Sequence, residues 1–179
     1  KTNLSVKTSF SEYTSSNWKS YFSVLGMLEM KLASYSWLKL SYFLIPRYYL
    51  RPYSDRDIDS DELFPCFFSN ESISMSYSKS LPLKRTWMRL KLSQGYQYYN
   101  TYFTEFDSKV SGLELSINTK YYNSYYLGVT LGYSISDNIS YGNELTSESS
   151  KINRSYTKNG FKFTIRKLAG VNSMGREDI

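Results

Sequence analysis

Apolar and polar residues alternate one by one along most of this chain. The clearest stretch lies between 111 and 137, where Leu113, Leu115 and Ile117 are each followed by a polar residue. The alternation resumes after a two-residue connection at 123-124. A period of two places the two sets of side chains on opposite faces of a β-strand. This stretch therefore predicts a β-hairpin.

The same alternation recurs along the chain and predicts eight strands. They are expected near 2-12, 17-32, 37-50, 71-80, 85-100, 111-122, 125-137 and 159-168. The connections near 33-36, 81-84 and 123-124 are short, whereas those near 51-70, 101-110 and 138-158 are long and polar. Apart from the short link at 13-16, short turns fall at one end of the strands and long loops at the other. The sequence thus predicts an all-β, antiparallel, up-and-down arrangement.

Two architectures bury one apolar face of such a sheet. One is a transmembrane β-barrel, whose apolar face contacts lipid, and the other is a soluble antiparallel β-sandwich. The predicted strands near 17-32 and 85-100 exceed the five or six residues typical of globular sheets. Tyrosine suits the boundary between lipid and water because its ring is apolar and its hydroxyl is polar. The tyrosines expected to form girdles at the two strand ends are Tyr48, Tyr49, Tyr98, Tyr99, Tyr121, Tyr122, Tyr125 and Tyr126.

The hairpin rhythm, and above all the segment Leu-Gly-Val-Thr-Leu-Gly-Tyr-Ser at 127-134, resembles the small eight-stranded β-barrel proteins of bacterial outer membranes. The resemblance covers most of the chain as a pattern and implies a transmembrane barrel in the cell envelope. Members of this class usually end on an aromatic residue that closes the last strand, whereas this chain continues past Ile165 to Ile179. We expect a single barrel domain over 1-170 and a tail over 171-179. The alternative is that these strands form part of a larger transport or export barrel.

Composition narrows the chemistry. The 179 residues include no histidine, carry a formal net charge of +6 and contain one cysteine, Cys66, which is expected to be a small buried hydrophobe. Without histidine the commonest general base and metal ligand is missing, and the barrel-borne enzymes of the resembling class rely on it. The sequence predicts no catalytic residue, no cofactor and no metal site. The dense acidic cluster Asp55, Asp57, Asp59, Asp61 and Glu62 is expected to be a solvated loop, with calcium binding as the alternative.

Basic residues are scattered singly along the strands rather than clustered, which does not favour nucleic-acid binding. If the apolar face contacts lipid, the opposite face lines the lumen. The charges expected there are Glu29, Lys31, Lys39, Arg89, Lys91, Glu114, Lys120, Lys162 and Arg166. These ions could pair with each other and fill a narrow barrel, or they could attract anions such as the phosphates of lipopolysaccharide.

The resulting functional prediction is a non-enzymatic outer-membrane protein that acts as a structural or surface protein, or as a small, porin-like, anion-favouring pore. Its expected partners are the lipid bilayer and lipopolysaccharide, while envelope protein partners and homo-oligomers are left open. The alternative from another class is a soluble or surface-attached β-sandwich module that binds carbohydrate or protein.

Overall fold

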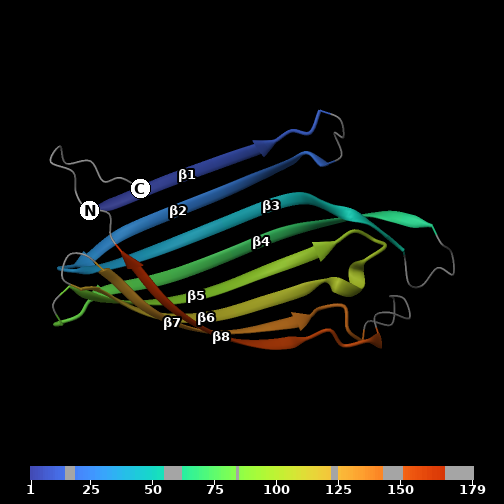
Figure 1. Ribbon diagram of the computed structural model, residues 1–179. Coiled ribbons are helices and arrows are strands. Elements are labelled where there is room, and N and C mark those ends of the chain that lie inside the picture. Colours follow the sequence, from blue (N-terminus) through green and yellow to red (C-terminus); the bar gives the residue numbers. More distant parts are fainter. Residues whose placement is uncertain (15–18, 55–61, 84, 122–124, 143–150, 168–179) are drawn as a thin grey trace.

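The computed structural model describes residues 1–14, 19–54, 62–83, 85–121, 125–142 and 151–167. Eight antiparallel strands form one sheet in chain order, and each strand pairs with its neighbours in sequence (Figure 1). The strands are β1 Thr2–Ser11, β2 Tyr21–Ala33, β3 Ser36–Ser54, β4 Leu63–Ser80, β5 Thr86–Tyr99, β6 Ser108–Tyr121, β7 Tyr125–Asn138 and β8 Tyr156–Lys167. A short 3-10 helix, η2, covers Thr104–Phe106. The predicted all-β, up-and-down meander of eight strands is confirmed.

The sheet is curved but open. Among the described residues β1 pairs with β2 alone and β8 with β7 alone, so the predicted closure into a barrel is not present. An eight-stranded barrel has an interior just wide enough for side chains to fill. Here one face carries the bulky side chains of Trp37, Trp87 and Tyr126, and the sheet curves without meeting itself. The sandwich alternative is also wrong in its layering, because the eight strands lie in one sheet rather than two.

The register places apolar residues beside apolar residues over most of one face of the sheet. One row of consecutive Cα partners runs from β1 to β7 and consists of Leu4, Leu28, Leu40, Met75, Leu92, Leu113 and Tyr133. The adjacent row on the other face consists of Asn3, Glu29, Lys39, Ser76, Lys91, Glu114 and Gly132. A slip of one residue in any pairing would mix the two sets. One face is therefore mostly apolar, although Asn159 on β8 ends the first row, and the other is mostly polar, although Leu25, Met27 and Phe43 of β2 and β3 lie on it.

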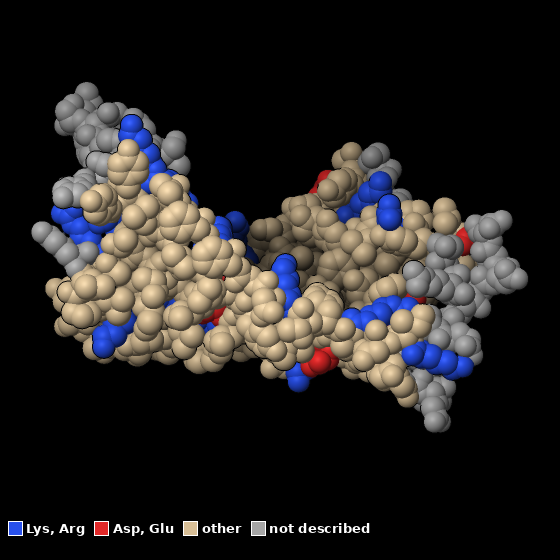
Figure 2. Space-filling view, turned by 60° about the horizontal axis from the view of Figure 1, so that its bottom comes forward, with Lys and Arg blue, Asp and Glu red and all other residues tan. Residues whose placement is uncertain are grey.

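Many large apolar side chains of this sheet are exposed, whereas several small polar ones are buried. On the apolar face Leu131 is 51% exposed and Ile135 is 36% exposed, whereas Ser116 and Ser136 on the polar face are 1% and 4% exposed. Only Cys66 and Phe103 are buried hydrophobic residues in the described part of the chain. Figure 2 shows one side of the molecule, where uncharged residues cover much of the middle, basic residues are more frequent towards the ends and a hollow lies between them.

The strands β3 and β4 extend beyond their predicted limits. The sequence predicted 37-50 and 71-80, but β3 ends at Ser54 and β4 begins at Leu63. Their pairing is interrupted by bulges between Ile45 and Tyr48 and again between Tyr49 and Pro52. Each interruption includes a proline, which has no N–H to donate to the sheet. The two strands continue past these bulges and shorten the predicted loop at 51-70.

Candidate functional site

All nine predicted lumen charges lie on the polar face. The register places Glu29, Lys39, Lys91 and Glu114 in one row, Lys31, Arg89 and Lys162 in the next, and Lys120 and Arg166 in a third. Seven of these nine residues are basic and two are acidic. These charges share a face because alternate residues of a strand point to the same side. The register then aligns these sides from one strand to the next.

One ion pair occurs among these charges in the described residues. Arg89 Nη2 lies 3.0 Å from Glu114 Oε1, and both side chains are partly exposed. The hydroxyl of Ser116 donates to the same carboxylate oxygen at 3.4 Å and lies 3.0 Å from the hydroxyl of Thr130. Exposed ion pairs contribute about 0–1 kcal/mol to stability, so this pair orients Glu114 more than it stabilises the sheet.

A recess of about 300 Å³ opens on the polar face near the short-turn ends of β4 to β8. We call it the basic–aromatic recess; it is lined by Ser78, Trp87, Arg89, Ser116, Asn118, Tyr126, Thr130, Lys162, Thr164 and Arg166. Trp87 and Tyr126 have ring centroids 5.6 Å apart, and the Arg166 guanidinium lies 5.8 Å from the Tyr126 centroid. The individual charges were predicted from the sequence, but their grouping with these two rings depends on cross-strand register and was not.

A glycine next to this recess fixes the positions of two of its lining residues. Gly128 lies between Asn118 and Thr164 in the register. A Cβ added at Gly128 would lie 2.6 Å from Asn118 Oδ1, the atom that accepts the Tyr126 hydroxyl proton at 2.6 Å. Any side chain at position 128 would therefore displace Asn118 and with it the Tyr126 ring.

The predicted girdle tyrosines divide between the two faces. Tyr49, Tyr98, Tyr121 and Tyr125 lie on the apolar face, whereas Tyr48, Tyr99 and Tyr126 lie on the polar face. Tyr122 lies outside the described residues. Adjacent tyrosines such as Tyr48-Tyr49 and Tyr98-Tyr99 necessarily point to opposite faces of a strand. Of the described girdle tyrosines, four therefore lie on the face expected for a girdle: Tyr49, Tyr98, Tyr121 and Tyr125.

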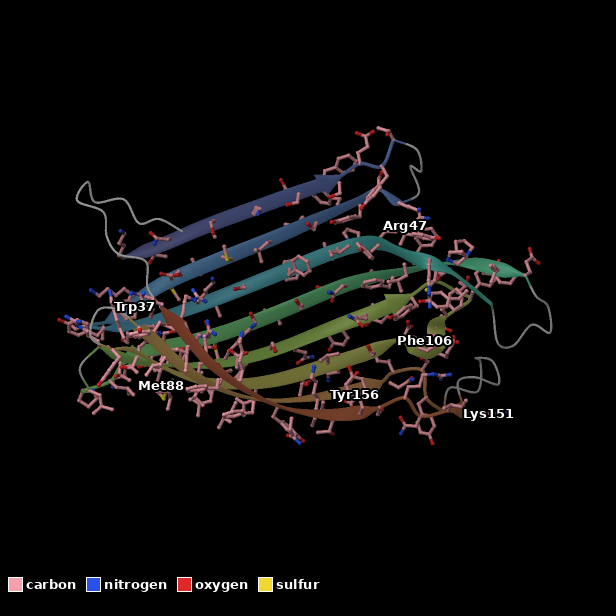
Figure 3. The ribbon with its side chains drawn as sticks, in the orientation of Figure 1. Trp37, Arg47, Met88, Phe106, Lys151 and Tyr156 are labelled. Atoms are coloured by element: carbon pink, nitrogen blue, oxygen red, sulfur yellow. The ribbon has the colours of Figure 1, made fainter. Side chains whose placement is uncertain are left out.

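At the loop end the polar face is covered by an aromatic cluster that the sequence did not predict. Its ring contacts join Phe64 to Tyr102 at 4.4 Å, Tyr53 to Phe103 at 6.0 Å and Tyr99 to both Phe68 and Phe106 at 5.7 and 5.8 Å. Figure 3 shows Phe106 and Arg47 at this end of the sheet, and Trp37 and Met88 at the other. The missed signal was the run of apolar residues without alternation from Leu63 to Phe68, which is typical of a strand covered on both faces.

Polar side chains hold the segment 100-107 over this cluster. The Asn100 carboxamide accepts the Phe67 N–H at 3.2 Å and donates to the Pro65 carbonyl at 3.0 Å, so it continues the hydrogen-bond ladder of β4. At the other side of the segment, the Asn138 carboxamide donates to the Glu105 carbonyl at 2.7 Å and the Ser140 hydroxyl donates to the Thr104 carbonyl. The segment is thereby fastened to both β4 and β7.

Cys66 and Glu105 line a cavity of about 340 Å³ beneath the aromatic cluster. Cys66 is 3% exposed, as expected from its apolar surroundings in the sequence. Burial, and then the negative charge of Glu105, raise the pKa of the Cys66 thiol to about 11. The thiol therefore stays protonated at neutral pH, which disfavours nucleophilic chemistry.

The acidic cluster offers no test of calcium binding, since Asp55, Asp57, Asp59 and Asp61 lie outside the described residues. The described ranges contain no group of three or more His, Cys, Asp or Glu side chains that could hold a metal ion together. No helix in those ranges is long and apolar enough to cross a membrane. Comparison with protein-family models, with curated proteins and with solved structures finds no match to this chain.

Proposed function

We propose that this sheet is the wall of a non-enzymatic bacterial outer-membrane β-barrel, with its apolar face towards lipid and its polar face towards water. One observation carries the proposal: the register brings apolar residues from all eight strands onto one face, and many of those side chains are exposed. A contiguous apolar surface of this extent is rare on soluble monomers and marks contact with a membrane or another protein.

The height of the apolar band supports a membrane rather than a protein partner. At the loop end the row that contains Glu71, Tyr96 and Lys109 is already polar, and at the short-turn end the band stops at Thr86 and Thr119. Between these two limits β5 has nine residues, 87–95, of which Met88, Leu90 and Leu92 face the apolar side and Gln94 borders the loop-end limit. A tilted strand needs about 9 to 11 residues to cross the hydrocarbon of a bilayer.

Tyrosines on the apolar face flank this band. Tyr98 and Tyr49 lie beyond its loop end, while Tyr121 and Tyr125 lie beyond its short-turn end. Rings at these heights suit the two headgroup layers, where the hydroxyl meets water and the ring meets acyl chains.

A wall in lipid must have no unpaired strand edge, because each unsatisfied backbone group costs several kcal/mol in hydrocarbon. The two edges of the sheet suit each other: β1 and β8 run in opposite directions, and each keeps its apolar side chains on the same face of the sheet. In the proposed state these edges are paired, either with each other or with further strands of a larger barrel.

The wetted face suggests what the protein handles. Its predicted lumen charges are seven basic and two acidic, and an excess of positive charge raises the local concentration of anions. The proposed role is a structural or surface protein of the outer membrane, or a small anion-favouring pore, and basic residues near its rims would contact lipopolysaccharide phosphates.

The test is the environment of each face in a bilayer. Nitroxide labels are attached to single cysteines at 127–135 on β7 in a Cys66→Ala background, and the protein is reconstituted into phospholipid vesicles. We expect oxygen accessibility to peak at Val129, Leu131, Tyr133 and Ile135, and accessibility to a water-soluble nickel chelate to peak between them. A label at the exposed Lys151 is the water-facing control. Equal nickel accessibility on both faces would reject the proposal.

A further inference from the structure

The basic–aromatic recess has the composition of a binding site for a small organic anion. An inference about it deepens the proposed function and rests on it, because the proposal makes this face the one in contact with water. The recess occupies about 300 Å³, the lower end of the range for ligand pockets in proteins. Its lining comes from five consecutive strands whose pairing does not depend on what lies against β1 or on how the edges are closed.

The charge of the recess favours an anion. Arg89, Lys162 and Arg166 are basic, and none of the ten described residues that line it is acidic. The nearby Glu114 offsets Arg89 through their 3.0 Å ion pair. The charge excess is therefore concentrated on β8, where Lys162 and Arg166 flank Thr164 on the same face. Both are charged donors, which form stronger hydrogen bonds to oxyanions than neutral groups do.

The aromatic groups favour a ligand with a flat body. Trp87 and Tyr126 form a tilted ring pair beside these cations, with the Arg166 guanidinium over the Tyr126 ring. Arg guanidinium planes and aromatic rings both accept stacking from a flat partner. Gly128 lets Asn118 and the Tyr126 ring lie close to the β7 backbone, since a Cβ at that position would lie 2.6 Å from Asn118 Oδ1.

We propose that this recess binds small aromatic carboxylates, with the carboxylate held by Lys162 and Arg166 and the ring held against Trp87 and Tyr126. Neutral aromatic compounds lack the group that the two cations bind. Simple carboxylates without a ring lack the stacking. Both are therefore expected to bind more weakly than a compound that has both parts.

The experiment measures binding of radiolabelled benzoate by equilibrium dialysis against the full chain in a non-ionic detergent. We expect saturable binding at one site per chain. Benzamide, the neutral counterpart of benzoate, and acetate, which has no ring, should each compete about tenfold less well, a change worth roughly 1.4 kcal/mol. Lys162→Gln and Arg166→Gln should each weaken benzoate binding by about the same factor through loss of one charged hydrogen bond.

The matched control is Lys158→Gln, which removes a positive charge from the same strand and face but outside the recess. It should leave benzoate affinity unchanged. Trp87→Phe should retain binding that Trp87→Ala loses, because a ring is kept in the first variant. A far-ultraviolet circular dichroism spectrum typical of β-sheet verifies that each variant folds.

Three results would overturn the site: equal binding of benzamide and benzoate, equal competition by acetate, or as large a loss in Lys158→Gln as in Lys162→Gln. These outcomes are separable from the fate of the proposed function. Labels on β7 that alternate between lipid and water, combined with no benzoate binding, would leave the membrane wall standing and remove the site. Benzoate binding without that alternation would keep the binding site and reject the membrane wall.

Discussion

At the scale of single residues, the groups that fix this molecule's shape are polar side chains that replace missing backbone partners. Asp107 is the clearest case. Its carboxylate accepts the Tyr99 N–H at 2.6 Å, and its main-chain carbonyl accepts the Ile139 N–H at 2.9 Å. One residue thus joins the end of β5 to the residue after β7, outside the apolar band.

Asp107 also gives a pH dependence with a definite sign. Burial raises the pKa of its carboxyl above the ordinary value, and the hydrogen bond from Tyr99 opposes this only in part. A carboxyl whose pKa is raised by folding binds its proton more tightly in the folded state. Its contribution to stability is therefore fully present below the pKa of the unfolded chain and is lost as pH rises through the folded value.

We expect Asp107→Asn to keep an oxygen that accepts the Tyr99 N–H. The variant should not lose stability as pH rises, because the amide does not ionise. Its thermal midpoint in detergent should equal or exceed that of the parent at pH 7, with a smaller change between pH 4 and pH 7. Asp107→Ala should lose roughly 1–3 kcal/mol, because the Tyr99 N–H is left without its partner. Circular dichroism melts decide the matter. If the asparagine variant is as unstable as the alanine variant, the charge itself is what stabilises this position.

At the scale of the strand, the two faces must tolerate the same substitution very differently. Ser74 and Met75 are neighbours in the middle of β4, yet Ser74 lies in a row with Ser41 and Ser93 while Met75 lies in a row with Leu40 and Leu92. The local backbone is the same for both. Only the face distinguishes them.

In a bilayer we therefore expect Met75→Lys to cost about 2–4 kcal/mol, the range for a lysine on the lipid face near the membrane midplane. Ser74→Lys should cost less than about 1 kcal/mol, since its ammonium group reaches water. Urea unfolding of both variants in phospholipid vesicles measures the difference. Equal costs at the two positions would mean that the apolar face does not meet hydrocarbon.

The strands also show how far sequence reasoning reaches. Alternation alone located the hairpin β6–β7 to within a few residues and put all nine charges on one face, because a period of two survives any correct register. It failed at Leu63–Asn70, where apolar residues occupy both faces at the start of β4 and no alternation exists. It also treated paired tyrosines such as Tyr125-Tyr126 as one girdle, although neighbouring residues in a strand point to opposite faces. The basic–aromatic recess needed cross-strand neighbours, which a single sequence does not contain.

At the scale of the whole molecule, the open edges are the main difference from the predicted barrel. Both edges expose backbone donors and acceptors that a bilayer would penalise. The polar-face residues of the edges include Ser5 and Lys7 on β1 and Lys158 and Lys162 on β8. The proposed function requires these two edges to acquire partners in the membrane.

If the partners are each other, a cysteine at Ser5 should form a disulfide with a cysteine at one of positions 158, 160, 162 or 164 of β8. The variants are made in a Cys66→Ala background and oxidised in vesicles, and gel mobility separates links within one chain from links between two. Cysteines at Ser134 and Lys158, which are Cα partners in the register, serve as the positive control. If only the control pair links, β1 and β8 are joined by other strands and the larger-barrel alternative is favoured.

The aromatic cluster at the loop end has a consequence for how the chain assembles. Among the described residues, this cluster is where apolar side chains bury each other. Cys66 and Phe103, the two buried hydrophobic residues, are both 3% exposed. Such a nucleus can form in water, whereas under the proposed function the long apolar band gains its contacts only on insertion into lipid. The molecule would thus arrive at its membrane with one end already ordered, and that end would hold strands β3 to β7 in register while the remainder inserts.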